Sequence, residues 1–160
     1  MIALAGAGLS AVAQKQVAAT LATGQKITLS QAGESKALQA ITRQQAAGKY
    51  YFLVHSQQKE LLSAATAQSS LRILAKVDNN TFMVATNQAP QSSDLQRWGV
   101  DATAVLEPAH KMRPSLAAGN IPAHALQGND RVQLMLATYK GIGVTEVRML
   151  LSQAGFHAAT

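Results

Sequence analysis

The feature that most constrains the fold of this chain is a series of alternating apolar and polar residues between positions 50 and 107. Tyr50 to Ser56 reads YYFLVHS, a run of aromatic and β-branched residues that is typical of a β-strand. The runs over residues 71–77, 81–85 and 100–107 alternate in the same way. The sequence therefore predicts four short strands in this part of the chain.

The segments between these strands predict a turn and two helices. Asp78 to Asn80 is rich in residues that tolerate a left-handed backbone, so the second and third strands are expected to form a hairpin. Residues 57–68 and 92–98 have helical spacing of their apolar positions. The resulting order, β-α-β-β-α-β, predicts an α+β domain over residues 50–110 of ferredoxin-like type, an antiparallel sheet with both helices on one face.

The C-terminal part of the chain predicts the beginning of a second unit of the same kind. Residues 111–130 are expected to be a linker, because three of the four prolines lie between residues 107 and 122. Residues 131–138 alternate like a strand, and a helix is expected after Gly143, with Gly155 as its cap. We therefore interpret residues 131–160 as the first half of a second unit, which either continues past Thr160 or docks on the first domain.

The N-terminal residues have the composition of an export signal. Residues 2–13 are apolar and small and end in Ala11-Val12-Ala13, which resembles a signal peptide cleaved after Ala13. The alternative is an Ala-rich helix or a disordered leader over residues 1–24. Residues 25–49 are interpreted as an arm with a short helix. We expect a secreted or cell-envelope protein with no membrane association after cleavage, because no apolar stretch reaches the length of a membrane span.

Composition and charge narrow the possible partners. The net charge of +6 is spread over single Lys and Arg residues, which does not favour nucleic-acid binding, because phosphate recognition needs clustered basic side chains. Cysteine is absent, which excludes disulfides, thiol nucleophiles and zinc ribbons. The four histidines lack metal-ligand spacing, and Ser115, His110 and Asp101 are not set in a nucleophile motif. The sequence predicts no catalytic residue, cofactor or metal.

Three segments carry a resemblance to a known family: YYFLVHS, LRILAKVDNNTFMVA and GVDATAVLEPAHKMRPSL. Over roughly residues 26–155 the chain resembles the propeptide-like N-terminal region of bacterial subtilisin-like serine peptidases. The resemblance implies a non-catalytic intramolecular chaperone and temporary inhibitor, whose sheet docks on a catalytic domain in cis. It also implies that the parent protein is a serine endopeptidase with its catalytic residues beyond Thr160.

A sheet with helices on one face leaves the other face available to a partner. We predict that Tyr51, Leu53, Leu74, Met83 and Val105 line this open face and bind the peptidase domain. The alternative is that these side chains pack against other parts of the same chain, either the arm of residues 25–48 or the second unit. For the function, the alternatives are a free-standing extracellular binding or protease-inhibitor module, and a small-molecule-sensing domain of ferredoxin-like fold. An uncleaved Met1 in the native protein would favour the last of these.

Overall fold

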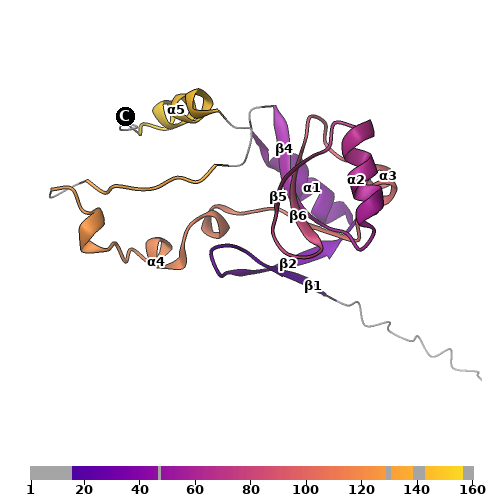
Figure 1. The fold of residues 1–160 in the computed structure, drawn as a ribbon, viewed down its shortest axis with the longest axis horizontal. Coiled ribbons are helices and arrows are strands. Elements are labelled where there is room, and N and C mark those ends of the chain that lie inside the picture. Colours follow the sequence, from indigo (N-terminus) through magenta and orange to yellow (C-terminus); the bar gives the residue numbers. More distant parts are fainter. Residues whose placement is uncertain (1–15, 47, 129–130, 139–142, 157–160) are drawn as a thin grey trace, which may run out of the picture.

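A computed structural model describes residues 16–46, 48–128, 131–138 and 143–156 of the chain (Figure 1). Its centre is an antiparallel sheet of seven strands that curls into a half barrel. The part of the chain after the last strand leads away from the sheet and returns with the C-terminal helix, as the orange and yellow ribbon in Figure 1 shows.

The strands and helices follow one another from residue 17 to residue 153. The strands are β1 (Val17–Thr20), β2 (Lys26–Gln31), β3 (Gln45–Ala46), β4 (Lys49–His55), β5 (Arg72–Lys76), β6 (Thr81–Thr86) and β7 (Ala102–Ala104). The helices are α1 (Ser35–Arg43), α2 (Lys59–Gln68), α3 (Ser92–Arg97), η1 (Pro108–Lys111), α4 (Pro114–Ala117), η2 (Ala123–Ala125) and α5 (Val144–Gln153).

The strand β4 is central in the sheet, whose order is β1-β2-β7-β4-β6-β5, with β3 paired to β4. Its ladder with β6 runs from Tyr50 opposite Thr86 to His55 opposite Thr81. The same strand pairs with β7 through Leu53 opposite Ala104. A strand between two neighbours has both edges paired and both faces covered, which suits the aromatic and β-branched residues of KYYFLVH.

One face of the sheet is covered by the three helices α1, α2 and α3. Phe52 and Val54 of β4 lie two positions apart, so their side chains point to the same face of the sheet, and both are fully buried under the helices. Each helix contributes a buried apolar residue at the sheet: Ile41, Leu62 and Leu95, respectively. This cluster is the main core of the chain.

The opposite face is covered by the β1–β2 hairpin. Leu53 and Met83, which point away from the helices, pack in a second cluster with apolar residues of the hairpin and of the end of β7. The other buried members of this cluster are Ala19, Leu21, Ile27, Leu29, Ala102 and Leu106. Both faces of the sheet therefore bury apolar side chains within the chain.

The predicted ferredoxin-like fold is wrong. The sheet has seven strands and curls into a half barrel, and the hairpin of residues 17–31 extends it beyond β7. The β2–β7 pairing places Ser30 opposite Thr103 and Gln31 opposite Ala102. These residues satisfy backbone groups that would otherwise remain unpaired at the β7 edge. The segment predicted as an arm is thus partly sheet.

A left-handed residue at the end of α3 fixes the turn into β7, and it gives the first testable prediction. Gly99 has φ +66°, and a β-carbon there would lie 3.1 Å from the Gln58 β-carbon and 3.2 Å from that of Leu61. We expect Gly99→Ala to lower the free energy of unfolding by about 2 to 3 kcal/mol, the sum of backbone strain and crowding. Gly24→Ala, at φ +83° with no heavy atom within 4 Å, is expected to cost only about 1 kcal/mol. Equal losses in urea unfolding would show that the crowding is absent.

Candidate protein-interaction surface

The residues predicted to line an open sheet face lie mostly inside the molecule. Leu53 is 0% and Met83 is 3% exposed, and both are covered by the β1–β2 hairpin. Tyr51 and Leu74 are half-buried at the margin of the same cluster. Val105 is also half-buried, but it packs against the helix-side core instead. The structure therefore brings four of the five residues together in one cluster, in which a partner could not reach Leu53 or Met83.

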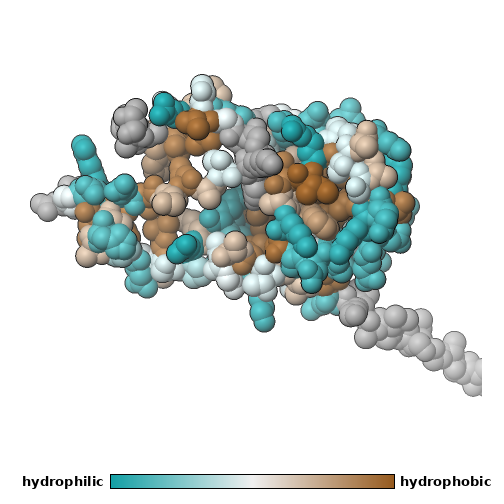
Figure 2. All heavy atoms as spheres, viewed as in Figure 1, coloured by the Kyte–Doolittle hydropathy of each residue, from teal (hydrophilic) through white to brown (hydrophobic). Residues whose placement is uncertain are grey.

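The apolar surface of the chain lies elsewhere, in residues 126–138 and 143–156, which we name the C-terminal apolar segment. Within the described residues, twelve large hydrophobic side chains are exposed, and nine of them belong to this segment. Met135 is 98% exposed and Val144 is 69% exposed. The brown patches on the left of Figure 2 lie over this part of the chain. The other seven are Leu126, Val132, Leu134, Leu136, Met149, Leu150 and Phe156.

The start of the segment is held by hydrogen bonds on either side of residues 129–130, which lie outside the described residues. Gly128 has φ +71°, a conformation that glycine adopts without steric cost. The Gln127 amide donates to the Arg131 carbonyl at 2.8 Å, and the Gln133 amide donates to the Ala125 carbonyl at 2.8 Å. Leu126 and Val132 form an isolated antiparallel bridge. These contacts hold residues 131–133 beside residues 125–127.

Residues 131–138 have the sequence pattern of a strand, but they do not form a full ladder of hydrogen bonds with another strand in the described part of the chain. All eight residues are exposed, and the bridge at Val132 is the one strand contact found for them in the described part of the chain. Val132, Leu134 and Leu136 fall on one side of the extended chain, whereas Gln133, Met135 and Ala137 fall on the other, so the first side is apolar throughout. The predicted strand is extended here, with its apolar side and most of its backbone open to a partner.

The helix α5 follows and ends as the sequence predicted. Gly155 has φ +80°, its amide donates to the Ser152 carbonyl, and the Phe156 amide donates to the Leu151 carbonyl at 2.8 Å. Val147 and Leu151 are half-buried on one side of the helix, whereas Met149 and Leu150 are exposed. The rest of the chain therefore covers only part of the apolar surface of α5.

The first turn of α5 lies close enough to the sheet for the charge of Glu146 to change the pKa of Tyr51. Burial raises the pKa of the Tyr51 phenol above its ordinary value of 10.0, and the negative charge of Glu146 raises this pKa further. A raised pKa means that folding favours the neutral phenol. This contribution to stability is fully present below pH 10.0 and is lost as the pH rises through the raised pKa.

A charge substitution in α5 tests this proximity. We expect Glu146→Gln to lower the pKa of Tyr51, because the like charge no longer opposes phenolate formation. Burial still keeps this pKa above the ordinary value. The titration is followed by the NMR shifts of the Tyr51 ring, with Glu107→Gln as a control of equal charge change. Identical Tyr51 titrations in the wild-type and Glu146→Gln chains would place α5 away from the sheet.

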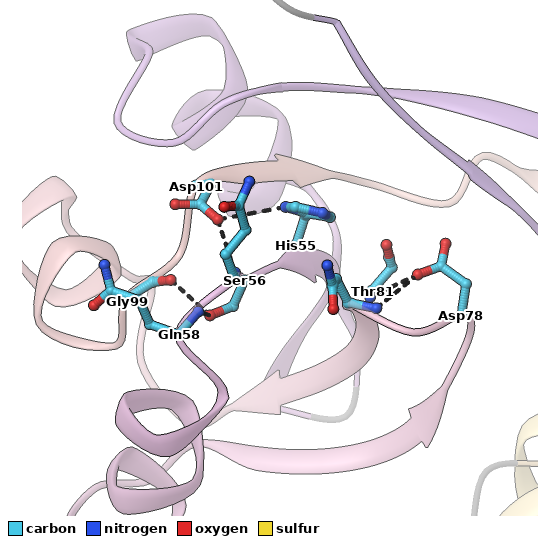
Figure 3. A network of polar contacts seen from close by, with 9 residues as sticks. His55, Ser56, Gln58, Asp78, Thr81, Gly99 and Asp101 are labelled. Carbon is cyan, nitrogen blue, oxygen red and sulfur yellow. Dashed lines mark hydrogen bonds and ion pairs between the residues drawn. The ribbon is translucent and has the colours of Figure 1, made fainter.

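A polar network joins the end of β4 to the turn before β7 (Figure 3). The fully buried Ser56 hydroxyl donates to the Gly99 carbonyl at 2.7 Å and accepts the Gln58 amide at 3.1 Å. Asp101 accepts the Gln57 amide at 2.9 Å, and its carboxylate lies 3.5 Å from Nδ1 of His55. Because the Ser56 hydroxyl is occupied as donor and acceptor, this network is suited to holding the chain rather than to nucleophilic attack.

Of the other chemistry-bearing residues predicted from the sequence, Ser115 and His124 are exposed, whereas His110 and Asp101 have structural contacts. His110 accepts the Glu107 amide through Nδ1 at 3.1 Å in the η1 turn, and Asp101 contacts His55 and Gln57. His157 lies outside the described residues. Among the residues that the structure describes, no group of three or more His, Cys, Asp or Glu side chains could hold a metal ion.

Comparison of the chain with family models, with curated proteins and with solved structures found no match. Within the described ranges, no helix has the length and apolar character needed to cross a bilayer. The stretch that resembles a signal peptide, with its cleavage point after Ala13, lies outside the described residues.

Proposed function

We propose that this chain is a non-catalytic protein-binding region that acts in cis on a subtilisin-like serine peptidase domain, as an intramolecular chaperone and temporary inhibitor. The observation that carries the binding role is the concentration of exposed apolar side chains in the C-terminal apolar segment. The peptidase as partner rests on the resemblance of the sequence to the N-terminal regions of that family. Export through a signal peptide is part of the same proposal.

The contact surface in this proposal is the C-terminal apolar segment. Exposed apolar patches of this kind are unfavourable in water and typically mark places where another polypeptide binds. Here Leu134, Leu136 and the exposed side of α5 supply the apolar contacts. The sheet face that the sequence predicts for docking is covered by the β1–β2 hairpin, so its buried residues Leu53 and Met83 are not available to a partner.

The backbone of residues 131–138 adds a second means of recognition. An extended segment with unpaired N–H and C=O groups can join the edge of another sheet, where main-chain hydrogen bonds give affinity and alternate side chains give specificity. Val132, Leu134 and Leu136 would then enter apolar pockets of the partner. We propose that the segment binds the peptidase domain by strand addition.

The test adds the purified chain in trans to the refolding catalytic domain encoded by the same gene, and measures the yield of active enzyme and the residual activity. We expect a higher yield and inhibition at equimolar chain. The variant Leu134→Lys/Leu136→Lys is expected to bind at least about 100-fold more weakly, because two apolar anchors are lost from the interface.

A matched variant controls for the added charge. Gln133→Lys/Ala137→Lys places two lysines on the other side of the extended segment and is expected to bind within about threefold of the wild type. Thermal melting of both variants checks that the fold is retained. If the wild-type chain changes neither yield nor activity, the peptidase role fails. If it does, but both lysine pairs weaken binding equally, the assigned surface fails.

A further inference from the structure

Residues 131–138 form an extended run whose first residues have one edge turned toward residues 125–127 (the orange ribbon in Figure 1). The backbone groups of Arg131 and Gln133 make the hydrogen bonds on this edge. Successive residues of an extended chain direct their N–H and C=O groups to opposite edges. Among the described residues, no backbone hydrogen bond is found on the other edge, which we name the free edge. Its residues are Val132, Leu134 and Leu136.

The free edge is complementary to a second copy of itself. When two copies pair antiparallel about a two-fold axis at Leu134, this residue lies opposite its own copy, and Val132 lies opposite Leu136. The residues of each pair then exchange N–H···O=C hydrogen bonds and place their apolar side chains next to each other. The paired residues carry no charge, and Arg131 comes opposite Ala137. The pairing therefore brings no like charges together.

The exposed apolar area is sufficient for a dimer of this kind. The exposed hydrophobic side chains of the C-terminal apolar segment together equal about five fully exposed ones, or about 1,000 Å² on each copy. A stable interface of standard size covers about 800 Å² of each partner. Paired strands alone would leave their apolar face in water, and the exposed Met149 and Leu150 of α5 supply apolar surface to cover it.

We infer that the free chain forms a two-fold dimer, in which residues 131–138 of two copies pair as antiparallel strands centred on Leu134 and the α5 helices cover the apolar face of the pair. The dimer needs no peptidase, so the failure of the proposed function would leave this inference standing. Where both hold, the second copy and the peptidase domain compete for the same edge. Dimerisation then keeps the segment covered until a peptidase domain binds it.

Sedimentation velocity of the complete chain measures the dimer. We expect a monomer of 16.8 kDa at about 1 µM and mostly dimer at about 500 µM, with a dissociation constant on the order of 50 µM. The measurement is made in about 0.3 M NaCl, which screens the repulsion between two chains of net charge +6. A monomer at every concentration would leave the segment to a different protein and overturn the inference.

A single introduced cysteine tests the position of the two-fold axis, because the chain has no cysteine of its own. Leu134→Cys places two thiols opposite each other, with α-carbons about 5.5 Å apart, which a disulfide can join. Ala137→Cys, also at an exposed position, places the two α-carbons about 20 Å apart. With oxidised glutathione and about 100 µM chain, we expect Leu134→Cys to form the cross-linked dimer at least about 10-fold faster on non-reducing gels. Equal rates for the two variants would overturn the inference.

Discussion

Leu53→Glu is expected to remove much of the stability of the chain at neutral pH. Leu53 is 0% exposed and is packed between β4 and the β1–β2 hairpin, so the new carboxylate would lose its hydration without gaining a partner. Burial of an unpaired carboxylate together with loss of the leucine costs about 4 kcal/mol or more, whereas whole domains are stable by about 5 to 15 kcal/mol. Much of the stability of the chain is therefore lost, which a large fall in the urea unfolding midpoint would show.

Leu74→Glu is the matched control for this change. Leu74 is half-buried on the edge strand β5, so its carboxylate keeps contact with water, and we expect a loss of about 1 kcal/mol. If the face were open to a partner, as the sequence alone predicted, the two substitutions would destabilise the chain equally little. Equal unfolding midpoints for the two variants would therefore contradict the packing described here.

Removal of the β1–β2 hairpin is expected to abolish cooperative folding. A chain that starts at Ala32 lacks the buried Ile27 and Leu29, leaves the β7 edge unpaired and exposes Leu53 and Met83 to water. Such a chain is expected to bind a hydrophobic dye, to aggregate, and to lose its sharp thermal transition.

The control for this deletion is a chain that starts at Gln16, which keeps every described strand. It is expected to melt as the full chain does. If the chain that starts at Ala32 melts sharply and within about 5 °C of this control, the hairpin contributes little, and the inner face of the sheet does not depend on it.

The strands that could be predicted from the sequence are those with long alternating runs. YYFLVHS corresponds to β4, and the runs on either side of Asp78 correspond to β5 and β6. The turn between them is fixed locally, because the Asp78 carboxylate accepts the Asn80 and Thr81 amides at 3.0 and 2.8 Å. Period-two patterning and turn chemistry are local properties, so a single sequence is enough to reveal them.

The fold class could not be predicted, because it depends on long-range pairing. The run KITLS in β2 is β-like, but its partner strand β1 consists of VAAT, in which alanines give only a weak strand signal. The signal that could have found the hairpin is the pattern of Ala19 and Leu21 before the Gly24 turn, followed by Ile27 and Leu29. Nothing local indicates that this hairpin joins β7, about 70 residues later in the chain.

The site was missed for the same reason. Alternation in β4 shows that Leu53 and Phe52 point to opposite faces, but it does not show which faces the chain covers by itself. The alternation over residues 131–138 predicts a strand, but a sequence does not show that this strand lacks a full ladder of hydrogen bonds.

Amide hydrogen exchange of residues 131–138 tests the proposed docking surface most directly. In the free monomer these amides are expected to exchange fast, because the segment is exposed and mostly unpaired. In a saturated complex with the catalytic domain they are expected to slow by at least about 100-fold, as hydrogen bonds to the partner's strand form. Unchanged exchange of these amides in that complex would contradict the proposal that this segment holds the partner.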